Sequence, residues 1–264
     1  MIGTISLKMM NNKKKTIQIG WLSTGNGEGS IGLLRKILEL TKKNKNISIS
    51  YVFCNRELGE KSGSDNFINF VNKNKIKIIN FSSNKFKKNS KKKWKDLRSL
   101  FDETVIEKIS KHKVDFIVSA GYMLFAPLLC KNYTIINLHP ALPNGPNGTW
   151  KQVIRKLIVN NEDESGISIH LMTPDLDEGP NISYCKFKIK SEELNTEWKA
   201  VQKNKNIEIE NSRLFFEIRK NIVNYEQILL YETISKIGMK EIDINNFLSL
   251  DLSAEVNKKV KQLS

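Results

Sequence analysis

Short apolar runs alternate with segments of helical period over the first 190 residues. Strands are predicted at residues 16–23, 47–54, 76–81, 114–120, 134–138, 166–171 and 182–189. Helices are predicted where apolar residues recur three and four positions apart, at residues 31–38, 67–71, 101–109 and 150–160. This alternation predicts an α/β fold of Rossmann type, with a mostly parallel sheet and helices on both faces.

The chain divides into three parts by pattern. Residues 1–14 are interpreted as a flexible tail, because their apolar start precedes the lysines at 13–15, the reverse of the order in a secretory peptide. Residues 15–190 are expected to form one catalytic domain. Residues 191–264 are mostly helical in pattern, and we expect them to pack on that domain.

Composition narrows the class of protein. The 264 residues include 43 Lys and Arg against 28 Asp and Glu, a formal charge of +15. A positive charge of this size is typical of proteins that bind a nucleic acid, a membrane surface or a small anionic substrate. It is also explained by a bias of the whole chain towards Lys, Asn and Ile, without any such partner. No run approaches the ~20 apolar residues of a membrane span, and three widely spaced cysteines suggest neither disulfides nor zinc. A cytoplasmic protein fits best.

The most basic segment, residues 85–98, holds eight basic residues and one acid. We interpret it as a solvated loop that enters a helix. The alternative is a nucleic-acid surface, with Phe86 and Trp94 as stacking groups.

Polar side chains follow the predicted strands of the second half. Asn137 and His139 lie at the end of the fifth strand, and Asp177 lies in the loop after a later one. Ligands of open parallel sheets bind outside the carboxyl ends of the strands. We therefore expect a site that contains these three side chains, whose amide, imidazole and carboxylate suit proton transfer and hydrogen bonding.

Three ordered motifs resemble the folate-dependent formyltransferases, above all those that act on glycinamide ribonucleotide in purine synthesis. They are Asn137-x-His139-Pro140, Gly166-x-Ser168-x-His170 and Leu176-Asp177-x-Gly179-Pro180. The likeness covers roughly residues 16–190 and includes the glycine loop at 25–27 and the run Ala-Gly-Tyr-Met at 120–123. It implies the formyltransferase fold.

The resemblance implies transfer of a formyl group from 10-formyltetrahydrofolate, a cosubstrate, to a primary amine, without a metal. Asn137 and His139 would stabilise the oxygen of the tetrahedral centre, and Asp177 would move protons. His170 packs or supports the site. The folate is expected to contact Met123, Leu124, Phe125, Thr173, Asp175, Leu176 and Gly179. The phosphate of the amine is expected to contact Gly25, Asn26, Gly27 and Ser30.

The sequence departs from the family at the end of the site where the amine is expected. Glu28 adds a negative charge to the glycine loop, and residues 143–150 lack the histidine that supports the aspartate in the family. Leu124 stands where an arginine is common. The resemblance also implies a substrate-contacting acid in the C-terminal helix, and neither Asn224 nor Tyr225, where we look for it, is an acid. The acceptor amine is thus left open.

Alternative activities remain beside this interpretation. An amino sugar linked to a nucleotide is a second acceptor. Methionyl-tRNA formyltransferases carry a C-terminal β-barrel, for which residues 191–264 lack the strand pattern, and formyltetrahydrofolate hydrolases carry a regulatory domain in front. A basic nucleic-acid-binding protein is the alternative from another class. A monomer and a homodimer both stay open.

Overall fold

The computed structural model describes residues 16–90, 92–174, 179–203 and 208–262. Over these residues the strands form one eight-stranded sheet in the order β3-β2-β1-β4-β5-β6-β7-β8. The strands are β1 (Ile17–Ser23), β2 (Ile47–Cys54), β3 (Ile78–Asn80), β4 (Phe116–Ser119), β5 (Ile135–His139), β6 (Glu164–Leu171), β7 (Asn181–Lys188) and β8 (Leu250–Asp251). Every strand predicted from the sequence is present.

The sheet is parallel on one side and mixed on the other. Strands β1 to β5 run parallel to one another, β6 is antiparallel to both β5 and β7, and β8 is parallel to β7. The predicted Rossmann-like, mostly parallel α/β fold is therefore confirmed.

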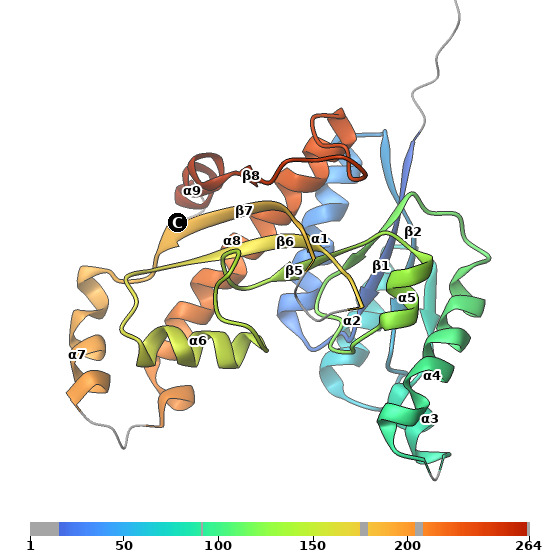
Figure 1. The fold of residues 1–264 in the computed structure, drawn as a ribbon, viewed down its shortest axis with the longest axis horizontal. Helices are drawn as coiled ribbons and strands as arrows, with labels where there is room; N and C mark the ends of the chain where they lie inside the picture. Colours follow the sequence, from blue (N-terminus) through green and yellow to red (C-terminus); the bar gives the residue numbers. More distant parts are fainter. Residues whose placement is uncertain (1–15, 91, 175–178, 204–207, 263–264) are drawn as a thin grey trace, which may run out of the picture.

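Helices cover both faces of the sheet (Figure 1). They are α1 (Glu28–Lys43), α2 (Ser62–Lys73), α3 (Ser83–Lys88), α4 (Trp94–Ile109), α5 (Pro127–Asn132), α6 (Trp150–Val159), α7 (Asn195–Lys203), α8 (Arg213–Met239) and α9 (Ser253–Lys261). One apolar cluster joins α1, α2, α6 and α8 to the sheet, and a second joins α4 and α5 to the other face.

Strand β1 shows why the central strands read as continuous apolar runs. Trp21 belongs to the cluster under α1 and α8, whereas the next residue, Leu22, belongs to the cluster under α4. Successive side chains of a strand point to opposite faces, and both of these are fully buried. In a strand that helices cover on both faces, both sets of alternating side chains are buried, so the sequence is apolar at nearly every position.

The basic segment is more ordered than the sequence suggested. Ser82 caps α3 by accepting a hydrogen bond from Lys85 N at 3.0 Å, and Phe86 packs edge-on against Phe81 and Phe101. The prediction of a solvated loop that enters a helix is therefore wrong at residues 85–88, which belong to α3, whereas residues 94–98 begin α4 as predicted and the described lysines of the segment are exposed. Arg98, inside α4, is only 6% exposed.

The C-terminal region packs on the same sheet. The 27-residue helix α8 lies against α1 and strands β6 and β7, and α9 lies against α8 and β7. This places the middle of α8 near the carboxyl ends of the parallel strands. No helix among the described residues has the length and apolar content that crossing a membrane requires.

Candidate active site

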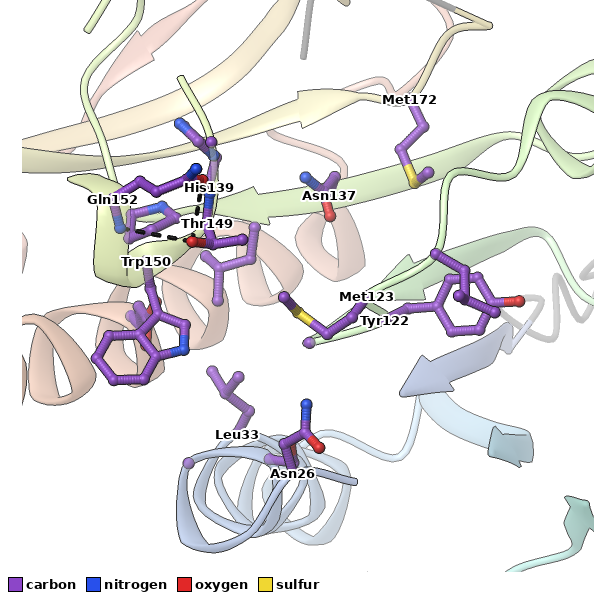
Figure 2. A pocket seen from close by; sticks show the side chains of 18 of the residues that line it. Asn26, Leu33, Tyr122, Met123, Asn137, His139, Thr149, Trp150, Gln152 and Met172 are labelled. Carbon is purple, nitrogen blue, oxygen red and sulfur yellow. Dashed lines mark hydrogen bonds between the residues drawn. The ribbon is translucent and has the colours of Figure 1, made fainter. Parts of the chain in front are cut away.

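A cavity of about 590 Å³ opens beside the ends of β1, β4 and β5. Six segments surround it: the start of α1, residues 121–125 after β4, the end of β5, residues 148–152, residues 170–173 at the end of β6 and the middle of α8. Figure 2 shows Asn137 between His139, which lies on the same strand β5, and Met172, which follows β6. Met123, Leu33 and Asn26 lie across the opening. The cavity lies at the carboxyl edge of the sheet, as expected for this fold.

Asn137 is held by His170 on the neighbouring antiparallel strand. The two residues are register partners, and Asn137 Nδ2 lies 3.2 Å from His170 Nε2. His170 Nδ1 lies 3.0 Å from the carbonyl oxygen of Leu171, which only accepts, so Nδ1 carries a hydrogen. In the neutral ring Nε2 then accepts from the amide of Asn137. This orientation leaves the second amide hydrogen and the oxygen of Asn137 for a ligand.

His139 lies two residues further along β5, and its side chain therefore leaves the same face of the sheet as that of Asn137. It is 7% exposed, and its Nε2 lies 3.1 Å from the carbonyl oxygen of Pro146. That carbonyl requires a hydrogen on Nε2. A second hydrogen on Nδ1 makes the ring an imidazolium, which both donates and carries positive charge.

Helix α8 contributes two charged side chains that the sequence did not single out. Arg219 and Glu226 both line the cavity, with Arg219 Nη1 lying 3.3 Å from Glu226 Oε2. Burial raises the pKa of the Glu226 carboxyl, and the positive charges of Arg219 and His139 partly oppose this rise. Glu226 is thus a buried acid of the C-terminal helix that lines the cavity, one residue beyond Tyr225. Their spacing of seven residues, two helical turns, places both side chains on one face of α8, but the spacing alone does not indicate that this face lines the cavity.

Arg219 is held in place by more than its carboxylate partner. Its guanidinium carbon lies 4.6 Å from the ring centroid of Trp150. A Cβ built on Gly29, in the first turn of α1, would lie 3.5 Å from Arg219 Nη2. The guanidinium is thus stacked on an aromatic ring and lies close to the N-terminus of α1.

The start of α6 fixes Trp150. Thr149 Oγ1 accepts from Gln152 N at 3.4 Å, and Gln152 Oε1 accepts from Thr149 N at 2.8 Å, which together form a capping box. Figure 2 shows this pair beside His139 and above Trp150. The loop at 143–150, which lacks the family's histidine, therefore brings an aromatic ring to the site.

The opposite wall of the cavity is apolar. Met123, Leu124 and Phe125 all line it, and the exposed fractions of Met123 and Phe125 are 47% and 43%. Side chains of this size are seldom left exposed together unless they bind something. Such a wall suits a flat, partly apolar ligand.

The other residues singled out in the sequence lie as follows. Asn26, Ser30 and Thr173 line the cavity, whereas Gly25 and Gly27 shape the turn before α1 with positive φ angles of 67° and 106° and do not line it. Gly179 packs its backbone against the carbonyl of Leu171, which leaves no space for a side chain. Asp175, Leu176 and Asp177 fall outside the described residues. Within the described residues no cluster of three metal ligands occurs.

Comparison with known proteins identifies the family. Residues 28–210 match the family described as Formyl transferase. The chain belongs to the formyl transferase family. This confirms the resemblance seen in the motifs, and with it an enzyme of the formyltransferase type.

Individual relatives are more distant. Phosphoribosylglycinamide formyltransferase of Escherichia coli (strain K12) is 32% identical over 94 residues, which cover 34% of this chain and 43% of that protein. The matched part thus spans less than half of the curated relative.

Solved structures show the same fold at lower identity. Phosphoribosylglycinamide formyltransferase from Campylobacter jejuni superposes with a TM-score of 0.59 at 21% identity, over 84% of this chain and 98% of that one. Formyltetrahydrofolate deformylase from Burkholderia mallei has a TM-score of 0.63 at 15% identity, over 88% and 69%. Both likenesses concern the fold.

Proposed function

We propose that this protein transfers a formyl group from 10-formyltetrahydrofolate to the primary amine of a small phosphorylated acceptor, glycinamide ribonucleotide. One observation carries the proposal. Asn137 and His139 lie on one face of β5 in a single cavity, between an apolar wall at 123–125 and the charged side chains of α8. The donor and the acceptor then meet at these two side chains.

The chemistry follows from the groups present. The amine nitrogen attacks the formyl carbon, and the carbonyl electron pair moves to the oxygen. The amide hydrogen of Asn137 that His170 does not use and the imidazolium of His139 stabilise the developing negative charge. The carbon–nitrogen bond to the folate then breaks, the attacking nitrogen loses a proton and the folate nitrogen gains one. We assign this proton transfer to Asp177, as the family resemblance implies.

The acceptor end of the cavity supports a phosphorylated substrate. Gly29 and Ser30 belong to the first turn of α1, where the helix dipole favours an anion; the N–H of Ser30 itself donates to Gly27 O at 3.1 Å. Arg219 adds a guanidinium beside this turn. Glu28 is exposed and does not line the cavity, so its charge faces solvent rather than the anion.

The activity is tested by product analysis. Purified protein is incubated with 10-formyltetrahydrofolate and glycinamide ribonucleotide, and the formylated amine and free formate are measured separately. We expect formylated amine in proportion to tetrahydrofolate formed. Formate without formylated amine would identify a hydrolase, as in the deformylases of similar fold, and transfer to an amino sugar nucleotide alone would replace the acceptor.

A further inference from the structure

The apolar wall of the cavity is an irregular segment with little backbone pairing of its own. It joins the end of β4 at Ser119 to the start of α5 at Pro127. On the β1 side it is held by Thr24, whose N–H donates to Gly121 O at 3.0 Å and whose Oγ1 accepts from Met123 N at 2.9 Å. The stretch beyond Met123 must be held by something else.

Two buried charged residues of α4 hold that stretch. Arg98 Nε donates a hydrogen bond to the carbonyl oxygen of Phe125, and Asp102 Oδ2 accepts from Leu128 N at 3.2 Å. The two side chains also pair with each other, at 2.5 Å between Arg98 Nη2 and Asp102 Oδ1. Arg98 is 6% exposed and Asp102 is fully buried.

Arg98 and Asp102 lie one turn apart on α4, so the ion pair between them does not connect α4 to another element of the fold. Burying two charges is costly, and a hydrophobic pair of similar volume is often as stable. The contacts that connect α4 to another part of the chain through these polar groups are those to Phe125 and Leu128. The buried charges therefore serve the segment between β4 and α5.

We propose that Arg98 and Asp102 are positioning residues for the formyl donor, which hold the 122–125 wall in the conformation that receives the folate. The inference rests on the proposed function, because it names what the wall binds. Neither residue lines the cavity, so neither contacts the donor directly. When a binding-competent conformation is populated only in part, the apparent dissociation constant rises by the inverse of that fraction.

The test compares three variants in the full chain. Arg98→Met removes the bond to Phe125 and leaves Asp102 unpaired, whereas the double variant Arg98→Met with Asp102→Leu removes both charges. Glu232→Gln is the matched control, since Glu232 is a buried carboxylate paired with Lys259 Nζ at 2.6 Å, between α8 and α9 and outside the cavity lining. The measurements are KM for 10-formyltetrahydrofolate and for the amine, the unfolding midpoint, and amide hydrogen exchange over residues 122–128.

The expected pattern separates positioning from stability. Arg98→Met raises KM for the donor about tenfold or more and KM for the amine by no more than about threefold, with faster exchange at 122–128. The double variant recovers the unfolding midpoint but keeps the raised donor KM. Glu232→Gln lowers the midpoint and leaves both KM values unchanged.

Two results would overturn the proposal. One is recovery of donor KM together with stability in the double variant, which would make the pair merely structural. The other is unchanged exchange at 122–128 in Arg98→Met. If the native protein binds no folate at all, the proposed function fails, and the exchange rates alone decide whether Arg98 and Asp102 position the wall.

Discussion

Arg219 offers the sharpest test of the acceptor end of the site. Its guanidinium stacks on Trp150 at 4.6 Å, lies beside the first turn of α1 and pairs with Glu226. A hydrogen bond to a charged group contributes about 1.5–3 kcal/mol, which corresponds to roughly 10- to 150-fold in binding. We expect Arg219→Met to raise KM for the phosphorylated amine within this range, while KM for the folate changes little. Methionine keeps much of the apolar contact with Trp150.

The same substitution leaves Glu226 buried without its partner, so a matched control is needed. Arg213→Met serves this purpose: Arg213 lies on the same helix and pairs with Glu197 at 2.5 Å, but its side chain is 66% exposed and does not line the cavity. The double variant Arg219→Met with Glu226→Gln removes the unpaired charge. Steady-state kinetics with each substrate varied in turn would refute the assignment if the two KM values rose equally in Arg219→Met, or if the amine KM stayed within about threefold.

The remaining predictions concern chemistry, the loop and pH. Asn137→Ala, His139→Ala and Asp177→Asn should each lower kcat by at least ~10²-fold with an unchanged unfolding midpoint; activity within a few-fold of the wild type in all three would remove the catalytic assignment. Gly29→Asp should raise KM for the amine more than for the folate, because Gly29 lines the cavity and a carboxylate there adds charge and bulk beside Arg219, and equal effects would contradict this. Burial raises the pKa of Glu226 in the folded protein, so its carboxyl favours folding below its ordinary pKa of about 4.3, and this contribution is lost as pH rises through the folded value. Denaturant titrations at pH 4 to 7 give the free energy of unfolding of Glu226→Gln minus that of the wild type. We expect this difference to increase as pH rises, and a difference that does not change with pH would refute the raised pKa.

The sheet could be predicted from the sequence because its strands are covered on both faces. Each central strand is an apolar run of four to eight residues bounded by turn residues, and such runs have few alternative structures. Asn137 and His139 followed from the same pattern, since polar residues at the end of an apolar strand mark the carboxyl edge of the sheet. The short elements α3, α5 and β8, of six, six and two residues, carry too few residues for a period to show.

The acceptor end could not be predicted from local pattern. Arg219 and Glu226 lie more than 70 residues after His139 in the chain. They line the same cavity as His139 because α8 packs against α1 and β6. In the sequence they are two of several charged residues in α8, another of which, Glu232, is buried against Lys259 outside the cavity. Position 226 also directly follows Asn224 and Tyr225, the positions at which the resemblance led us to expect an acid. Tertiary packing, and not spacing, decides which of these charges enters the cavity.

The groups proposed to act on the formyl carbon and the groups proposed to select the amine come from different elements of the fold. The groups proposed to act on the formyl carbon are fixed by strands: Asn137 and His139 on β5, with His170 as register partner on β6. The groups proposed to select the amine come from the first turns of α1 and α6 and from the middle of α8, where the guanidinium of Arg219 stacks on Trp150 and lies beside Gly29. A substitution at Trp150 or Arg219 can therefore change the acceptor without moving β5, because no hydrogen bond of Asn137 or His139 runs through either side chain. The loop at 143–150, where Trp150 stands instead of the histidine that the resemblance implies, therefore alters the wall beside Arg219 and not the strand that carries Asn137 and His139.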